Sequence, residues 1–374
     1  MHTVLLFSAL MVTLASCGGG HSVQKSDGGN TVALRYATNL KLTEHESYTE
    51  AAIRNPWDTT KTLHRYYLVD RDAELPAIPA DGSVIRVPVT NALIYSTVHN
   101  GLINELGALD ALGGVCDAQY NTIPAIVDGI ASGRIADCGN GMSPNLEKII
   151  ALRPQVIMLS PFENNDRYGK VGELGIPIVE CADYMENSPL ARAEWVKFYG
   201  RLFGRVAEAD SMFADTESRY LALKEKAAGS SGRPRVLIDQ RYGQVWHVPG
   251  GASTMGIYIT DAGGINPFGA NTTSGSIPLA PEKVLADAHD ADVWLIRYNQ
   301  ATPKTLAELA ADAPVNSRFA AFKTGNVWGC NTSVSGFYEQ TPYHPDRLLA
   351  DLISILHPEL GFPAPEHRYY KKMK

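Results

Sequence analysis

Short apolar runs alternate with stretches of helical spacing along most of the chain. From about residue 84 onward, runs long enough for one buried strand are followed by segments whose apolar residues recur every three or four positions. Strands that alternate with helices predict parallel sheets with right-handed crossovers. The pattern predicts strands at 89–95, 156–159, 176–180, 236–238, 244–248 and 326–328, a strand-like Gly-Gly-Val-Cys ending at Cys116, and helices at 102–112 and 345–356.

One sequence segment that predicts a helix followed by a strand occurs twice. Residues 143–159 read SPNLEKIIALRPQVIML, and residues 280–296 read APEKVLADAHDADVWLI. Each copy places a Pro near the start of a helix, then Glu-Lys, then apolar pairs at helical spacing, and ends in an apolar strand. The repetition predicts an α/β fold with two Rossmann-like lobes, each built on a central parallel sheet.

A single long helix is predicted between the two lobes. Ser188 supplies an N-cap, Pro189 suits the first helical position, and no cluster of breaking residues follows before Gly229. A helix over 188–229 would measure roughly 60 Å, so it would have to lie along both lobes. A coiled coil is the competing interpretation, but the apolar stripe is rich in aromatic residues and short in heptads.

The segment before the first lobe has a different pattern. Thr31 to Asp70 alternates apolar and polar residues around the turn-forming Asn55-Pro56, which predicts antiparallel strands that extend the first lobe. The predicted organisation is a signal peptide at 1–17, a flexible tether at 18–30, a first lobe at 31–187 with the extension at 31–70, the connecting helix at 188–229, a second lobe at 233–358 and a tail at 359–374.

The first residues resemble a bacterial lipoprotein signal. An apolar run from Val4 to Ala15 is too short to span a bilayer and leads into Leu-Ala-Ser-Cys, followed by three glycines. By this resemblance Cys17 is the acylated first residue of the mature protein, and the protein is lipid-anchored in the periplasm of a bacterium. A plain cleaved signal with a chance Cys is the alternative. Met1-His2-Thr3 lacks the usual basic residue, which leaves open that the true start lies elsewhere.

Composition narrows the class of protein. The chain is 45% hydrophobic and 20% charged, which is typical of globular proteins. Its 374 residues exceed the length of one ordinary domain. The net charge of −7 argues against a partner made of nucleic acid, which requires a basic face. No two of the four remaining cysteines form a C-x-x-C pair, and their spacing is compatible with disulfides or with buried free thiols. These cysteines are Cys116, Cys138, Cys181 and Cys330.

Enzyme signatures are missing from the chain. Residues 139–144 lack the third glycine of a dinucleotide-binding loop, and the sequence has no Walker loop, G-x-S-x-G elbow or H-E-x-x-H helix. We therefore expect no catalytic residues and no resident cofactor or metal. Three histidines keep direct zinc or manganese binding open as an alternative: His99, His247 and His344.

Aromatic and basic residues follow the predicted strands in both lobes. Ligands of open parallel sheets bind beyond the carboxyl ends of the strands, so these residues are candidate ligand contacts. Aromatic rings with a few guanidinium groups suit a large, partly apolar ligand that carries acceptor oxygens. The candidates are Tyr95, His99, Phe162, Arg167, Tyr168, Asp183 and Tyr184 in the first lobe, and Arg241, Tyr242, Trp246, Arg297, Tyr298, Phe337 and Tyr338 in the second.

Residues 84–358 resemble the substrate-binding proteins of ABC importers for cobalamin and iron complexes, the periplasmic binding family with a helical backbone. The resemblance rests on the two repeated phrases, on SPLARAEWVKFYGRLFGRVAEADSMF and on HPDRLLADLISILHPEL. It implies a monomer with a ligand cleft between two lobes, without catalysis. It also implies that the protein captures a metal chelate, whose metal is Fe or Co, for an inner-membrane permease and its ATPase.

The resemblance assigns a docking role to one acidic residue on each lobe. Glu147 and Glu282 match the motif positions that pair with arginines of the permease. Ferric siderophore, cobalamin and haem all remain open as ligands, and haem could use Tyr95, His99 or Tyr242 as an axial ligand. A two-lobed metal chelatase, which would insert metal into a macrocycle, is the alternative from a different class.

Overall fold

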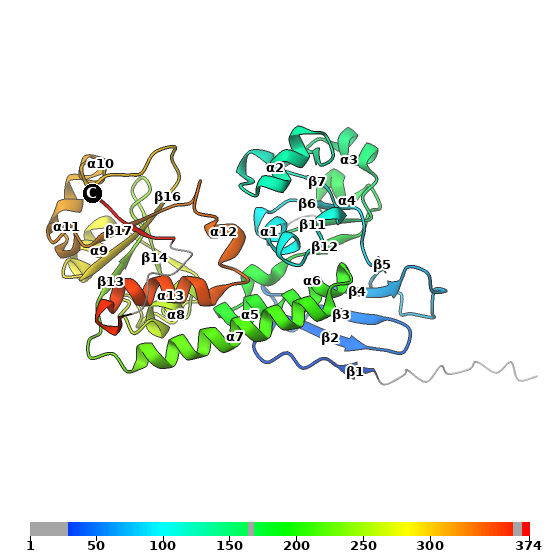
Figure 1. Ribbon diagram of the computed structural model, residues 1–374, viewed down its shortest axis with the longest axis horizontal. Coiled ribbons are helices and arrows are strands. Elements are labelled where there is room, and N and C mark those ends of the chain that lie inside the picture. Colours follow the sequence, from blue (N-terminus) through cyan, green and yellow to red (C-terminus); the bar gives the residue numbers. More distant parts are fainter. Residues whose placement is uncertain (1–28, 164–167, 362–368) are drawn as a thin grey trace, which may run out of the picture.

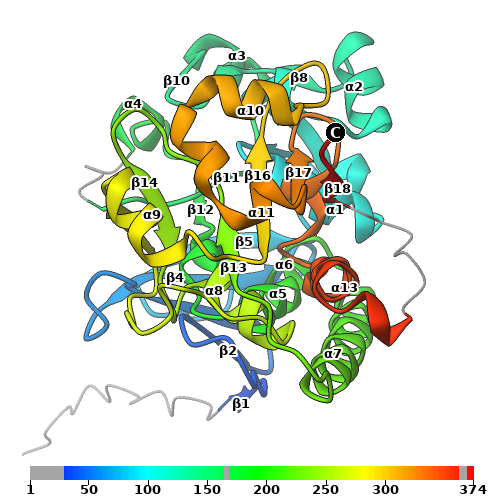
Figure 2. The ribbon, with the colours of Figure 1, turned by 90° about the vertical axis from the view of Figure 1, so that its left-hand side faces the viewer.

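A computed structural model describes residues 29–163, 168–361 and 369–374. Two α/β lobes stand side by side, a separate β-sheet lies below the first lobe, and one long helix runs beneath both lobes (Figure 1). Seen after a 90° turn, the second lobe faces the viewer and the separate sheet lies below (Figure 2). The predicted fold class, two parallel-sheet lobes joined by one long helix, is confirmed.

The extension before the first lobe is a five-stranded sheet in the order β1-β2-β3-β4-β5. Strands β1 to β4 are antiparallel neighbours, as predicted, whereas β5 runs parallel to β4. The predicted end of the extension at residue 70 is therefore wrong, because the sheet continues to residue 87. The strands are β1 (Asn30–Thr31), β2 (Leu40–Glu44), β3 (Thr49–Arg54), β4 (Thr62–Asp70) and β5 (Ser83–Val87).

One face of this sheet packs against the first lobe. Leu42, Ile53 and Tyr66 are fully buried in the same apolar core as Ile94 of the lobe. The Tyr66 hydroxyl also donates a hydrogen bond to the carbonyl of Ile178, at 2.9 Å. Alternation along the strands places the apolar side chains on this face, so burial of one face fixes the register of the sheet.

Residues 35–39, which we call the strap, join β1 to β2 and are held by buried carboxylates. Glu194 accepts hydrogen bonds from the backbone N–H groups of Arg35, Tyr36 and Ala37 at 2.8 to 2.9 Å. Glu186 accepts from the N–H groups of the next two residues. Each carboxylate therefore satisfies backbone donors that lie outside any sheet.

The first lobe has a parallel sheet in the order β12-β11-β6-β7-β8. Its strands are almost wholly apolar because helices cover both faces of such a sheet. The strand predicted at 156–159 is present with these bounds, and the strands predicted at 89–95 and 176–180 are present but shorter. The bounds are β6 (Ala92–Ile94), β7 (Leu112–Val115), β8 (Ala136–Asp137), β11 (Val156–Leu159) and β12 (Ile178–Glu180).

The helix predicted at 102–112 is displaced toward the N-terminus. Helix α1 (Thr97–Glu105) begins after Ser96, whose hydroxyl accepts a hydrogen bond from the N–H of Val98. It ends before Gly107, whose φ of 66° lies in the left-handed region that favours glycine. The other helices of the lobe are α2 (Pro124–Ala131), α3 (Leu146–Leu152) and α4 (Gly169–Gly172), and a short hairpin joins β9 (Gly139–Asn140) to β10 (Ser143–Pro144).

The long connecting helix is present, but its predicted start at residue 188 is wrong. Three helices fill the predicted range: α5 (Pro189–Glu194), α6 (Val196–Leu202) and α7 (Val206–Ala228). The chain turns at Gly204, whose φ of 67° interrupts the helical path. Helix α7 is thus the long one, and its 23 residues span ~35 Å.

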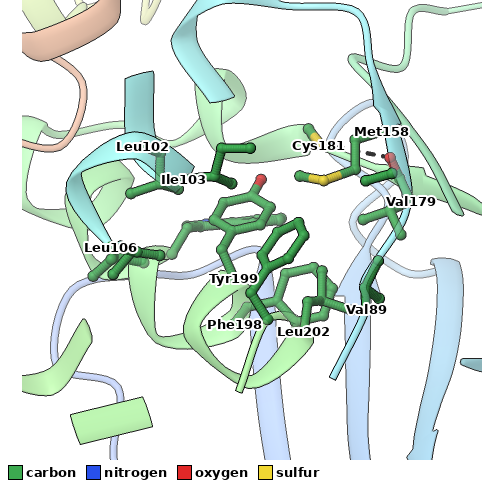
Figure 3. Packing of buried hydrophobic residues seen from close by; sticks show 14 of the residues in the cluster. Val89, Leu102, Ile103, Leu106, Met158, Val179, Cys181, Phe198, Tyr199 and Leu202 are labelled. Atoms are coloured by element: carbon green, nitrogen blue, oxygen red, sulfur yellow. Dashed lines mark hydrogen bonds between the residues drawn. The ribbon is translucent and has the colours of Figure 1, made fainter. Parts of the chain in front are cut away.

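Helices α6 and α7 carry side chains into the cores. Phe198, Tyr199 and Leu202 of α6 lie against α1 and the strands of the first lobe (Figure 3). Helix α7 contributes to both lobes, since Phe213 belongs to the core of the first lobe and Tyr220 to that of the second.

The second lobe has a sheet in the order β13-β16-β17-β18, whose first three strands are parallel. A two-stranded antiparallel sheet, β14-β15, lies beside it. The strands are β13 (Val236–Ile238), β14 (Trp246–Pro249), β15 (Ser276–Leu279), β16 (Val293–Tyr298) and β17 (Val327–Asn331). The helices are α8 (Thr254–Asp261), α9 (Pro281–Ala288), α10 (Leu306–Asp312), α11 (Ala320–Lys323), α12 (Phe337–Gln340) and α13 (Pro345–Leu356).

The tail predicted at 359–374 is part of the second lobe. Strand β18 (Lys371–Lys372) pairs antiparallel with β17 at the edge of the sheet. Tyr369 and Tyr370 are buried, and their backbone N–H groups both donate to the Asp351 carboxylate at 2.8 Å. The end of the chain therefore covers a sheet edge that would otherwise be open.

Helix α12 joins the two lobes next to α1. A Cβ atom at Gly101 of α1 would lie 2.4 Å from the carbonyl oxygen of Glu339, so only glycine permits this approach. The Glu339 carboxylate accepts a hydrogen bond from the Thr122 hydroxyl at 2.9 Å. His344, just before α13, pairs with Glu105 at the end of α1. Within 29–163, 168–361 and 369–374, the structure has no helix of the length and apolarity needed to cross a membrane.

Candidate functional site

A pocket of about 700 Å³ lies at the carboxyl ends of the first-lobe strands. Tyr95 follows β6, Asp117 follows β7, and Phe162 follows β11, so the pocket occupies the position where open parallel sheets bind ligands. Tyr168 and Lys170 line the same pocket at the start of α4. The structure thus brings together three of the predicted contacts, namely Tyr95, Phe162 and Tyr168.

Asp117 organises one wall of the pocket. It has a φ of 51° directly after β7, and its carboxylate accepts hydrogen bonds from the Asn140 side chain at 3.0 Å and the Gly141 N–H at 3.2 Å. These bonds fix the β9–β10 hairpin, whose tip carries Met142 with 85% of its surface exposed. Sequence reasoning missed Asp117 and Met142, although Asp117 follows the predicted strand that ends at Cys116.

The tyrosines of the pocket remain neutral phenols. Burial raises the pKa of Tyr95, and nearby Cys116 raises it further. Burial also raises the pKa of Tyr168, whose hydroxyl donates to Glu180 at 2.6 Å. Both hydroxyls are therefore protonated, but that of Tyr168 is engaged by Glu180 and that of Tyr95 is buried, so the two residues can offer ring surface to the pocket rather than a phenolate.

The strand ends of the second lobe carry an arginine that is already paired. Asp239 follows β13 with a φ of 57°, and its carboxylate accepts from Nε of Arg297 at 3.1 Å and from a second guanidinium nitrogen. Burial lowers the pKa of Arg297, but the charge of Asp239 outweighs burial and raises it above the usual value. The guanidinium also lies over the ring of Phe337, 5.9 Å from its centroid.

Exposed apolar side chains follow strand ends on both lobes. Single exposed apolar side chains are ordinary on protein surfaces, whereas contiguous apolar patches mark binding sites. Tyr242, after β13, is 89% exposed, and Phe162, after β11, is 51% exposed. Met142 and Phe162 line the same first-lobe pocket. Among the described residues, the large apolar side chains exposed beyond strand ends are Tyr120, Met142, Phe162 and Tyr184 on the first lobe, and Tyr242, Val334 and Tyr338 on the second.

Several predicted contacts lie elsewhere. Trp246 is fully buried and donates its indole N–H to the carbonyl of Ile238, so it belongs to the second-lobe core. Phe337 is also buried, in a separate apolar cluster of the second lobe, and these two predicted contacts are wrong. The Tyr298 hydroxyl accepts from the Lys304 N–H at 3.1 Å, which turns its polar end toward its own loop. Arg167 lies outside the described residues.

His99 and Asp183 form a buried ion cluster instead of a ligand rim. The Asp183 carboxylate lies 2.9 Å from His99 Nε2 and accepts from Nε of Arg192 at 3.0 Å and from the Tyr199 hydroxyl at 2.9 Å. Burial lowers the His99 pKa, whereas Cys181 and Asp183 raise it by more, to about 10. His99 is thus a buried core residue paired with Asp183, and its prediction as a ligand contact is wrong.

Within the described residues, the histidines and cysteines form no cluster suited to a metal ion. His344 pairs with Glu105, His247 is exposed on β14, and the described part of the chain holds no group of three His, Cys, Asp or Glu side chains suited to a metal ion. Four cysteines are buried free thiols in the structure: Cys116, Cys138, Cys181 and Cys330.

The two predicted docking carboxylates occupy matching positions. Glu147 lies in the first turn of α3 and Glu282 in the first turn of α9, and both are exposed. A carboxylate near a helix N-terminus is also favoured by the helix dipole. The predicted lipidation site, Cys17, lies outside the described residues.

Comparisons with known proteins identify a family and several proteins of the same fold. Residues 101–333 match the family described as "Periplasmic binding protein". An uncharacterized lipoprotein of Methanocaldococcus jannaschii is 29% identical over 360 residues, which cover 89% of this chain and 84% of that protein. A periplasmic heme-binding protein of Pseudomonas aeruginosa has a TM-score of 0.58 at 18% identity and covers 76% of this chain and 98% of its own. The periplasmic vitamin B12-binding protein of Vibrio cholerae has a TM-score of 0.54 at 15% identity, with coverages of 74% and 99%.

Proposed function

Because the chain belongs to the periplasmic binding protein family, we propose that it is the lipid-anchored receptor of an ABC importer. In this proposal it captures a metal chelate between its lobes and delivers it to an inner-membrane permease. The similarity of the solved haem- and vitamin B12-binding proteins supports a chelate as the ligand. The lipoprotein relative supports attachment through Cys17.

The observation that carries the proposal is the first-lobe pocket at the strand ends, which exposed Met142 and Phe162 line. Phe162 lines the first-lobe pocket, and Tyr242 stands almost fully exposed on the second lobe. Rings of this kind gain free energy when a large apolar face covers them, through burial of area and through stacking. A macrocycle or siderophore offers such a face.

Direct titration tests this function. Purified protein is titrated with cyanocobalamin, haemin and the ferric hydroxamate ferrichrome, and binding is followed by calorimetry and by the absorbance of the chelate. We expect a reversible one-to-one complex with at least one probe. We also expect Phe162→Ala and Tyr242→Ala each to weaken it about threefold to tenfold, because each removes one stacked ring.

Leu221→Ala is the matched control, since Leu221 is an exposed apolar residue on α7, away from the strand ends. Its effect on affinity should be negligible. Absence of binding to all three probes would contradict the proposed function. A chelate that is chemically altered during the incubation would instead support the chelatase alternative, which the membership in a family of binding proteins disfavours.

Glu147 and Glu282 are proposed as the contacts with the permease. Both are exposed at the start of equivalent helices, so one partner with two related halves could bind both carboxylates at once. The double variant Glu147→Ala/Glu282→Ala should keep its affinity for the chelate and lose association with the permease in a pull-down from detergent-solubilised membranes. Glu208→Ala/Glu225→Ala, two carboxylates on α7, is the control. Unchanged association of the first double variant would rule out this docking role.

A further inference from the structure

We propose that Cys116 and Cys138 form a disulfide bond across two neighbouring strands of the first lobe in the exported protein. The structure shows the reduced form of this pair, with both side chains buried as thiols. The inference goes beyond the proposed function and takes from it only the exported location, since disulfides form and persist in oxidising compartments. The two cysteines directly follow β7 and β8, next to one wall of the first-lobe pocket.

The register of the sheet places the two cysteines opposite each other. Val115 of β7 pairs in parallel with Asp137 of β8, and each cysteine is the next residue of its strand. The Cys138 N–H donates to the Val115 carbonyl at 2.8 Å. One residue further on, the Asp117 N–H donates to the Gly139 carbonyl, also at 2.8 Å. Neighbouring strands lie about 4.8 Å apart, which is within the roughly 4.4 to 6.8 Å that a disulfide requires between its Cα atoms.

Both cysteine side chains lie on the same buried face of the sheet. Cys116 and Cys138 belong to one apolar cluster, together with Leu93 and Ile149. The Sγ atom of Cys138 leans toward β7, because a Cβ atom built on Gly114 would lie only 3.4 Å from it. Gly114 lies two residues before Cys116 and therefore on the same face of that strand. The backbone thus has the spacing and facing that the bond requires, and side-chain rotation supplies the rest.

The other two cysteines of the described chain lack this arrangement. Cys181 follows β12, which forms the opposite edge of the same sheet, and Cys330 lies in β17 of the second lobe. Both are buried thiols, as the proposed pair is. They therefore provide internal controls for any test of the pair.

The bond forms by exchange with a disulfide donor, such as the oxidised dithiol of an exported oxidoreductase. The thiolate of one cysteine attacks the donor disulfide, which gives a mixed disulfide and releases one donor sulfur as a thiol. The thiolate of the other cysteine then attacks the mixed disulfide, forms the S–S bond of the protein and releases the second donor thiol. The protein loses two protons and two electrons, and the donor disulfide takes up both.

Burial determines when the bond forms. Burial, the neighbouring Cys138 and Asp117 raise the pKa of the Cys116 thiol to about 12, and burial also raises the pKa of Cys138. The folded thiols are therefore protonated and react slowly, so the bond forms during folding, before the two strands are covered. It then links the residue before Asp117 to the residue before β9, and so fixes the pocket wall that Asp117 and the β9–β10 hairpin build.

Equilibration with glutathione tests the pair in the full-length protein. The purified chain is refolded at several ratios of glutathione to glutathione disulfide, from reduced and from oxidised starting material, and the alkylated peptides are identified by mass spectrometry. We expect the Cys116–Cys138 bond to form about a hundredfold more favourably in the folded protein than in guanidinium chloride, because a bond that fits the native structure restricts only the unfolded chain. A ratio near one or below would overturn the proposal.

Cys181→Ser is the matched control, because Cys181 is a buried thiol of the same lobe and its replacement should leave this ratio unchanged. Cys138→Ser should give no internal disulfide. A bond between Cys116 and Cys181 in that variant would show that thiols of this chain pair without regard to register, and it would overturn the assignment.

The state of the pair after export is measured on protein taken directly from membranes, quenched with acid and alkylated. Most molecules should carry the Cys116–Cys138 bond. A reduced pair in this sample would overturn the proposal, even if the bond forms with glutathione. Binding of the chelate is measured separately by titration, so failure of the disulfide and failure of the receptor function are distinguishable.

Discussion

Asp183→Ala is expected to lower the free energy of unfolding by about 3 to 5 kcal/mol, the usual cost of removing one partner from a buried ion pair. Asp183 is fully buried, and its two oxygens interact with His99, Arg192 and Tyr199 at 2.9 to 3.0 Å. Without the carboxylate, His99, Arg192 and Tyr199 would lose the acceptor that they share. Urea denaturation followed by circular dichroism measures the change.

Asp287→Ala is the control for this variant, because Asp287 forms an ion pair with Lys283 on the surface of α9. Exposed pairs of this kind contribute at most about 1 kcal/mol, so the control should have nearly the same free energy of unfolding as the parent. Asp183→Asn keeps the shape and removes the charge, and it should also be strongly destabilised. A loss below about 1 kcal/mol in both Asp183 variants would contradict the ion cluster described for the core.

Glu194→Ala is expected to lower the free energy of unfolding by about 3 kcal/mol and to release the strap. Its buried carboxylate accepts three backbone hydrogen bonds, from Arg35, Tyr36 and Ala37, and bonds to a charged acceptor contribute more than neutral ones. Removing it would leave three N–H groups without these acceptors. Hydrogen exchange of the three amides should become faster by at least about tenfold, which mass spectrometry of the peptide over 29–40 can measure.

Glu208→Ala serves as the control, since the Glu208 side chain is about half exposed and lies 3.4 Å from Arg205. In Glu194→Gln, the exchange rate of the strap amides and the free energy of unfolding should lie between those of the parent and of Glu194→Ala. The reason is that an amide keeps one acceptor oxygen but loses the charge. If exchange in the strap stays slow in Glu194→Ala, other contacts hold this segment and the role given to Glu194 is wrong.

The fold could be predicted where periodicity alone decides the structure. Strands Val156–Leu159 and Val236–Ile238 and helix α13 have the predicted bounds, because a short apolar run or an amphipathic stretch with a Pro at its start leaves few alternatives. The same reasoning failed between α6 and α7. Apolar spacing continues across Gly204, but the left-handed turn of that residue ends one helix before the next begins.

Candidate contacts could be predicted in position but not in orientation. The rule that ligands bind beyond strand ends placed Tyr95 and Phe162 correctly at a pocket. It could not tell that Trp246 turns into the core, because a residue near a strand end may face either side of the sheet. Nor could it show that Asp239 neutralises Arg297, since ion pairs between distant residues depend on the tertiary fold.

Helix α7 has a consequence for how the molecule loses its structure. Phe213 anchors its first half in one apolar core and Tyr220 anchors its second half in the other, less than two helical turns further on. A rigid helix whose two halves are anchored in different interiors joins those interiors mechanically. Melting of α7 would therefore remove apolar contacts from both lobes at once.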